Sequence, residues 1–196
     1  MSRSGQNKKR NISHLDANES DVVLQELLKR HPELRQEAEE MAECVIADVS
    51  VEGIAEEVSD RVLGVGLDEL NERAGSHSWG YVEPCEAAWE LLEEAVEDIA
   101  EDMKRRKEAG SEAAAEKICQ GIVLGLYKVK DDQNDGALGW SPDFPAEKAG
   151  QVLSDFIKLF PQNRRSAVGK RLIEELKPGV GEWMKMLDQV VQGASA

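Results

Sequence analysis

Apolar side chains recur along this chain at steps of three and four residues, the spacing that places them on one face of an α-helix. In residues 32–49 the acids lie on the side of the predicted helix opposite this apolar stripe. In residues 84–109 the same spacing continues through six turns. The alternation of apolar and polar residues that is typical of strands is essentially absent. The pattern predicts an all-α protein with helix over more than about 60% of its residues, against a usual share near one third.

Start and stop signals divide the chain into seven or eight amphipathic helices. The pair Ser20–Asp21 is a candidate cap for the first helix, and Ser50 for the third. Pro84 suits the first turn of the long helix over 84–109, which Gly110 ends. Short loops between such helices favour antiparallel pairs, so we expect a bundle or a short, irregular solenoid.

The domain organisation follows from the same pattern. Residues 1–18 are polar and basic and show no helical periodicity, so they are predicted to form a disordered tail. Residues 19–196 are predicted to form a single all-α domain, with a possible soft boundary in the long connection at 131–145. No run approaches the roughly 18 to 20 apolar residues of a membrane span, which predicts a protein that does not cross a membrane, and no signal peptide is recognisable.

Small residues and cysteines give two local predictions. Gly121 and Gly125 form a ridge of small residues on one helix, which predicts close packing against another helix of the same protein. The three cysteines, Cys44, Cys85 and Cys119, are far apart and odd in number, so we expect them to be free, reduced and mostly buried in a cytoplasmic protein.

The charge is distributed unevenly. Residues 1–11 carry four bases and no acid, residues 12–102 carry 26 acids and five bases, and residues 103–196 carry 13 acids and 15 bases, giving +4, −21 and +2. This balance argues against nucleic-acid binding by the folded body, where Lys and Arg must replace counterions. The acidity predicts a basic protein partner, unless it serves solubility alone or reflects adaptation to a salt-rich host.

The most acidic helix has eight acids and no base between residues 85 and 102. Like charges four residues apart cost about 0.2–0.5 kcal/mol per pair, whereas each buried apolar side chain contributes roughly 1.5–3 kcal/mol, so packing outweighs the repulsion. The acids are therefore either a solvated face or a docking surface for a basic partner. In the second case Glu90, Glu94, Glu97 and Glu101 are the candidate partner-binding residues, and they should be exposed and unpaired.

Candidate chemistry is sparse. The spacings of cysteine, histidine and acidic residues match no zinc, calcium, dinucleotide or nucleophile motif, so we predict no metal, no cofactor and no catalytic residue. Four aromatic residues lie in or beside predicted loops and either plug the ends of the helix layers or line a groove. They are Trp79, Tyr81, Trp140 and Phe144.

Two stretches resemble a known family. "ELLKRHPELRQEAEE" is followed by "WGYVEPCEAAWELLEEAVEDIAEDMKRRKEAGSEAAAEKICQGIVLGLYKVKDDQNDGALG". Together they resemble the helical region of bacterial SWIM zinc-finger proteins, over roughly residues 22–140. The resemblance implies an irregular TPR- or HEAT-like helical array that supports interactions. The zinc-finger motif itself is absent from this chain, so no metal ligand carries over.

The sequence thus favours a non-enzymatic, cytoplasmic helical scaffold or adaptor whose acidic surface binds another macromolecule, most simply a protein with a basic patch. Two alternatives remain open. One is a small-molecule-binding protein or enzyme with a pocket near the loops at 76–81 and 131–145. The other is an acidic mimic of nucleic acid that occupies a DNA-binding protein. The sequence predicts neither the partner's identity nor the oligomeric state.

Overall fold

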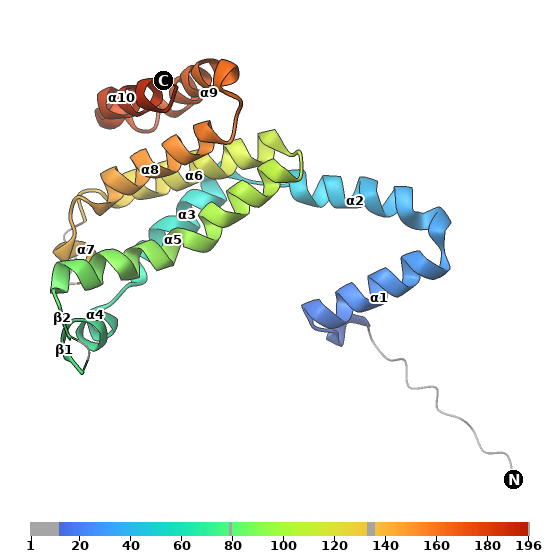
Figure 1. Ribbon diagram of the computed structural model, residues 1–196, viewed down its shortest axis with the longest axis horizontal. Helices are drawn as coiled ribbons and strands as arrows, with labels where there is room; N and C mark the ends of the chain where they lie inside the picture. Colours follow the sequence, from blue (N-terminus) through green and yellow to red (C-terminus); the bar gives the residue numbers. More distant parts are fainter. Residues whose placement is uncertain (1–11, 79, 133–135, 196) are drawn as a thin grey trace, which may run out of the picture. The chain divides into compact units, whose positions relative to one another are not determined.

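The computed structural model describes residues 12–78, 80–132 and 136–195 (Figure 1). Helices account for 81% of these residues, which confirms the all-α prediction. None of the helices in the described ranges combines the length and the apolarity that crossing a membrane requires.

The described part of the chain contains ten α-helices, three short 3-10 turns and two strands. The α-helices are α1 (Ala17–Arg30), α2 (Arg35–Ala47), α3 (Val51–Gly64), α4 (Leu67–Arg73), α5 (Pro84–Glu108), α6 (Glu112–Val129), α7 (Ala137–Trp140), α8 (Phe144–Lys158), α9 (Gln162–Leu176) and α10 (Met184–Ser195). The 3-10 turns are η1 (Ile12–His14), η2 (Pro32–Leu34) and η3 (Gly181–Trp183), and the strands are β1 (Gly75–His77) and β2 (Gly80–Val82).

The helix count exceeds the predicted seven or eight because of two short helices. α4 restarts after Gly66, whose N–H donates to the Glu69 carboxylate at 3.2 Å and so satisfies a free donor at the helix start. α7 lies within the connection predicted at 131–145. Its first residue, Ala137, is buried and donates its N–H to the carbonyl of Val65 at 3.0 Å.

A small antiparallel hairpin occupies a segment that was predicted to be a loop. Strands β1 and β2 pair with Gly75 opposite Val82 and His77 opposite Gly80. Gly75 and Gly80 both have positive φ angles, of 101° and 151°, which side-chain-bearing residues rarely adopt. Glycine at these two positions allows the chain to turn between α4 and α5.

The chain divides into two compact units, an N-terminal unit (Met1–Val45) and a C-terminal unit (Ile46–Ala196). The connection at 131–145 lies inside the second unit. Most of the predicted tail, residues 1–11, lies outside the described residues.

The predicted Ser20–Asp21 cap of the first helix is wrong. Asp16 caps α1 by accepting the N–H of Glu19 at 2.8 Å, and the Glu19 carboxylate accepts the N–H of Asp16 in return.

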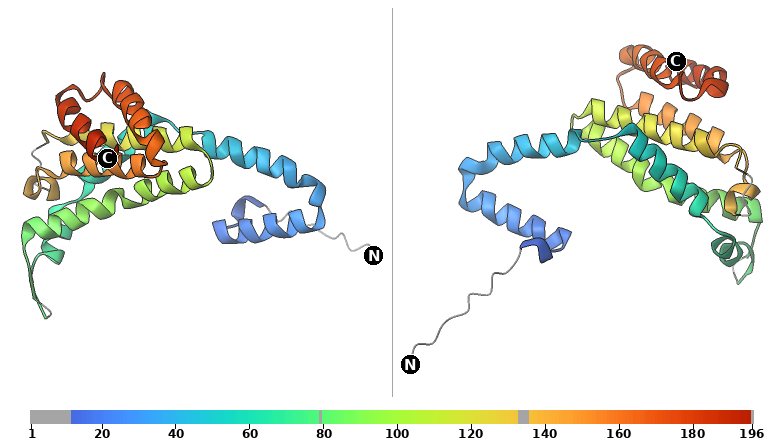
Figure 2. Two further views of the ribbon diagram at one scale, coloured as in Figure 1. Left: turned by 45° about the horizontal axis from the view of Figure 1, so that its top comes forward. Right: turned by 180° about the vertical axis from the view of Figure 1, so that it is seen from behind.

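The C-terminal unit is built in three layers. α3 and α5 form the first, α6 and α8 the second, and α9 and α10 the third (Figure 1). Figure 2 shows the same order from two further directions. α6 is the central helix and packs against α3, α5, α8 and α9. Consistent with this position, 11 of its 18 residues are buried.

The contact between α3 and α6 depends on the two glycines of the small-residue ridge. A Cβ atom at Gly125 would lie 2.6 Å from the carbonyl oxygen of Ala55 and 2.8 Å from Cβ of Val58. A Cβ atom at Gly121 would lie 2.5 Å from Cβ of Ile54. The hydroxyl of Ser59 joins the helices by donating to the carbonyls of Ala55, at 2.8 Å, and Gly125, at 3.1 Å. The predicted close packing at this ridge is confirmed.

We expect Gly125→Ala to lower the free energy of unfolding by about 1–3 kcal/mol, because the added methyl group overlaps the backbone of α3. The change is measured by urea unfolding followed by circular dichroism. Gly193→Ala in α10 is the matched control, since nothing lies within 4 Å of a Cβ atom built there. The control should be neutral or stabilising, because alanine favours helix over glycine by up to about 1 kcal/mol. Equal effects of the two substitutions would contradict the close-packing explanation.

Candidate interaction surface

The acidic surface is the outer face of α5. Pro84 occupies the first turn of this helix, and three bases in the last turn, Arg105 to Lys107, suit the negative end of the helix dipole. Its apolar stripe is buried against the rest of the unit. The buried residues are Ala87, Ala88, Leu92, Val96, Ile99 and Met103. Burial of this stripe leaves the acids on the opposite side of the helix, facing solvent.

Part of this acidic face is neutralised by Arg73 of α4. Its guanidinium donates to both carboxylate oxygens of Glu94, at 2.6 and 3.0 Å, and lies 3.7 Å from the carboxylate of Glu90. The hydrogen bond from Arg73 lowers the pKa of the Glu94 carboxyl group below its usual value. Glu90 and Glu94 are exposed, as predicted, but the prediction that they are unpaired is wrong.

Two further bases bind neighbouring acids. Arg61 of α3 donates to Asp98 and to Glu57, each at 2.6 Å, and its hydrogen bond lowers the pKa of the Asp98 carboxyl group. Lys148 of α8, which is buried, donates to Glu93 at 2.5 Å. Arg61 and Arg73 are two of only five bases between residues 12 and 102. Because bases are so rare in this acidic part of the chain, the sequence already marks Arg61 and Arg73 as candidate partners of the acids. Lys148 lies within an apolar segment far along the chain, and nothing in the sequence indicates that it binds Glu93.

Glu97 and Glu101 differ from the other candidates. Both are exposed, and neither forms a hydrogen bond or an ion pair with any other residue that the structure describes. They line a hollow of about 140 Å³ between α5 and α8. Its other charged lining residues are Glu93, Lys104, Lys148 and Asp155. Acids therefore outnumber bases in this hollow by four to two.

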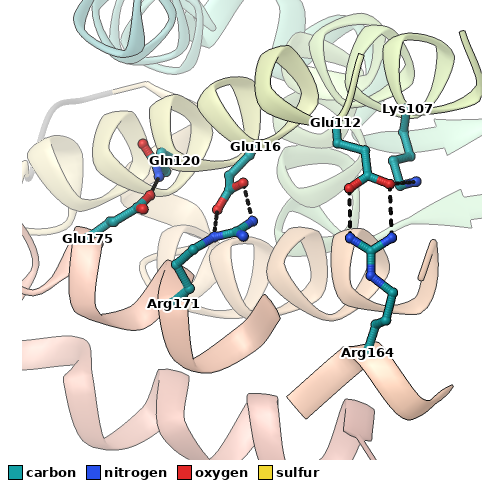
Figure 3. A network of polar contacts seen from close by, with 7 residues as sticks. All are labelled: Lys107, Glu112, Glu116, Gln120, Arg164, Arg171 and Glu175. Atoms are coloured by element: carbon teal, nitrogen blue, oxygen red, sulfur yellow. Dashed lines mark hydrogen bonds and ion pairs between the residues drawn. The ribbon is translucent and has the colours of Figure 1, made fainter. Parts of the chain in front are cut away.

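Basic residues of α9 bind acids on α6 rather than on α5 (Figure 3). Arg164 donates to both carboxylate oxygens of Glu112, at 3.3 and 2.9 Å, and Lys107 donates to the same carboxylate at 2.9 Å. These two partners lower the pKa of Glu112. Arg171 forms a similar forked pair with Glu116, which is buried. This row of ion pairs holds α9 against α6, so Arg164 and Arg171 do not neutralise the acids of α5.

The three candidate aromatics that the structure describes do not come together. Trp79 lies outside the described residues. Phe144 is fully buried and packs edge-on against Trp89, with ring centroids 5.1 Å apart. It is therefore a core residue in the first turn of α8, and its assignment to a pocket or groove is wrong. Tyr81 and Trp140 are exposed, at 60% and 51% of their surface.

Trp140 lies beside an open hollow of about 360 Å³ at the start of α5 and α8. Its lining residues are Cys85, Glu86, Trp89, Trp140, Ser141, Pro142, Asp143 and Glu147. Tyr81 is not among them. The loop at 131–145 thus contributes to this hollow, and no described residue of the hairpin at 75–82 lines it.

The cysteines offer no reactive centre in the core. Cys119 is buried, and burial raises the pKa of its thiol far above the usual value, with the nearby carboxylate of Glu116 adding to the shift. The prediction that the cysteines are mostly buried is wrong for Cys44 and Cys85, which are exposed free thiols. Within the described ranges, no group of three or more His, Cys, Asp or Glu side chains is arranged to hold a metal ion.

Comparison of the chain with protein-family models, with curated proteins and with solved structures finds no match in any of the three. The resemblance to the helical region of SWIM zinc-finger proteins gains no support from these comparisons and stays a prediction.

The paired carboxylates predict how stability depends on pH. Because Glu94 and Asp98 have lowered pKa values in the folded protein, their contribution is complete above the unfolded-state pKa, near about 4, and is lost as the pH falls through the folded-state pKa. We expect Arg73→Gln to lower the midpoint of thermal unfolding at neutral pH. The difference from the unmodified protein should close as the pH falls through the lowered pKa of Glu94 in the folded protein, below which this carboxyl group is protonated in both.

Lys170→Gln provides the control, since Lys170 is exposed and forms no ion pair with a described residue. It should leave the midpoint nearly unchanged at both pH values. A difference between Arg73→Gln and the unmodified protein that persists undiminished at acid pH would mean that Arg73 acts through packing rather than through its charge.

Proposed function

We propose that the C-terminal unit is a helical adaptor that binds a protein with a basic patch, and that Glu97 and Glu101 on α5 are the main contact residues. The proposal rests on one observation. These two carboxylates are exposed and lack a partner among the described residues, whereas neighbouring acids of the same helix already hold Arg61, Arg73 and Lys148.

The hollow beside these residues supports the proposal by its size. Pockets for drug-sized ligands usually measure about 300–1,000 Å³. A hollow of about 140 Å³ is smaller than this and suits a single Lys or Arg side chain of a partner. A partner's cation placed there would meet Glu97, Glu101 and Asp155, while Glu93 stays bound to Lys148. Arginine fits such a site well because its guanidinium can bind two carboxylates at once.

The proposed location is the cytoplasm. Cys44 and Cys85 are exposed and unpaired, and free exposed thiols persist most readily in reducing compartments.

An adaptor that binds through charge should associate with its partner at a rate that falls as the salt concentration rises, because exposed charges steer the encounter of the two proteins.

The open hollow beside Trp140 favours a second candidate function, the binding of a small molecule. Its volume of about 360 Å³ falls at the lower end of the range for ligand sites, and two indole rings lie on its wall. A ligand there should change the fluorescence of Trp89 and Trp140. Screening compounds by tryptophan fluorescence separates this function from protein binding, since Trp140→Ala would abolish the first and leave the second unchanged.

Replacing Glu97 and Glu101 together by Gln should weaken partner binding at least about tenfold. The same change should keep or slightly raise stability, since it relieves like-charge repulsion along the helix without breaking an ion pair. The partner is first captured from a lysate of the source organism at low salt, identified by mass spectrometry and purified. Its affinity is then measured between about 0.1 and 1 M salt, over which the screening length falls from about 10 to 3 Å.

Two double variants serve as controls with the same change in charge. Glu174→Gln with Asp188→Asn removes two acids from α9 and α10 and should leave partner affinity nearly unchanged. Glu90→Gln with Glu94→Gln should instead reduce stability, because it leaves Arg73 without its carboxylates. The proposal fails if the α9 and α10 variant weakens binding as much as the Glu97 and Glu101 variant does. Displacement of the captured partner by DNA would support the nucleic-acid mimic instead.

A further inference from the structure

The N-terminal unit has two helices whose apolar stripes are uncovered. Every residue of α1 and α2 lies in the described ranges, and none of these residues is buried. Val23, Leu24 and Leu27 of α1 are between 44% and 47% exposed, and Met41 and Val45 of α2 are 64% and 73% exposed. In Figures 1 and 2 the two helices diverge from the corner formed by η2.

Such helices need a packing partner. Isolated helices shorter than about 12–15 residues are marginal in water, and most helical stability comes from burying an amphipathic face. α1 and α2 have 14 and 13 residues. In the described part of the C-terminal unit, the large apolar side chains that are exposed are Leu63, Leu67, Tyr81 and Trp140. Each belongs to a different element, so they form no stripe that matches those of α1 and α2.

The charge of the N-terminal unit favours a second copy of itself over other partners. Residues 1–45 carry nine acids and seven bases, a net charge of −2, whereas residues 46–196 carry 30 acids and 17 bases, a net charge of −13. Two nearly neutral units repel each other little. A lipid surface fits less well, because helices that lie on anionic membranes have polar faces rich in Lys and Arg, whereas α2 carries four acids and one base.

The order of charges along α2 also favours one relative direction for two α2 helices that pair. Arg35, Glu39 and Glu43 follow one another at four-residue steps, so they lie along one side of the helix, beside the apolar stripe. All three are exposed, and none forms a side-chain hydrogen bond or ion pair with a described residue. In an antiparallel pair of α2 helices, the base at the start of one helix meets the acids toward the end of the other. A parallel pair would place like charges opposite each other.

We infer that the N-terminal unit associates with a second copy of itself. The apolar stripes of α1 and α2 from the two copies form the centre of a four-helix arrangement, and the α2 helices run antiparallel. Four helices are the usual number that lets every amphipathic stripe face inward. The two-fold symmetry makes each copy contribute the same surface, with Arg35 of one copy against Glu39 and Glu43 of the other. This association is independent of the acidic face of α5.

The mass of the full chain in solution tests the inference. By light scattering at about 50 µM, well above a micromolar dissociation constant, the protein should have twice its chain mass of 21.7 kDa. The triple variant Leu27→Gln, Met41→Gln and Val45→Gln should be monomeric, since glutamine keeps helix propensity but removes the apolar contact. Val22→Gln is the matched control. Val22 is 62% exposed but lies on the other side of α1 from Leu24 and Leu27, so this variant should stay dimeric.

A charge exchange tests the direction. Arg35→Glu should raise the dissociation constant at least about tenfold, and adding Glu43→Arg should restore it, because the antiparallel pair then again places unlike charges opposite each other. The C-terminal unit should unfold at the same temperature in all these variants. A fall from the dimer mass to the monomer mass then cannot be attributed to global unfolding. The Glu97 and Glu101 variant should remain dimeric, which separates this inference from the proposed function.

A monomeric unmodified protein at this concentration would overturn the inference, as would a triple variant that stays dimeric. A monomer that instead sediments with vesicles of anionic phospholipid would also overturn it and would assign the stripes to a membrane surface.

Discussion

The C-terminal unit depends on the close approach of α3 and α6. Without side chains at Gly121 and Gly125, the backbones of the two helices come near enough for Ser59 to bond across the interface. α6 can then present its remaining surfaces to α5, α8 and α9, which makes it the centre of three layers. The position of the acidic helix follows from this arrangement, since α5 packs on α6 with its apolar stripe and can only face its acids outward.

The acidic face illustrates how a strongly charged helix is tolerated. Arg61, Arg73 and Lys148 come from three different helices, and each binds acids of α5. Exposed ion pairs contribute little individually, typically up to about 1 kcal/mol. Lys148 differs from these exposed pairs because its side chain is buried. Removing Glu93 would leave its charge buried without a partner, which is strongly destabilising. The face is thus part structural and part free, because Glu97 and Glu101 are unpaired among the described residues while Asp98 between them binds Arg61.

Periodicity alone predicted the fold class, the long helix over 84–109 and the close contact at the glycine ridge, because all three depend on local spacing. The pairing of Glu90 and Glu94 could not be predicted in the same way. Arg73 reaches them only after the hairpin at 75–82 turns the chain back, and that hairpin depends on two glycines rather than on an alternating pattern. Phe144 was misassigned for a related reason. It follows a loop rich in turn residues, yet it belongs to the first turn of α8 and packs on Trp89.

The contact between Ser59 and Gly125 joins residues 66 positions apart in the chain, which bears on the order of events during synthesis. At about 5–20 residues per second, α3 leaves the ribosome roughly 3 to 13 s before its packing partner is complete. During that interval α6 cannot cover α3, although Val58 and Val62 of α3 are fully buried in the finished protein. The dense acids of α3 and α5 are made in the same interval and repel other nascent chains. We therefore expect like-charge repulsion to reduce aggregation of the unfinished protein until α6 is made.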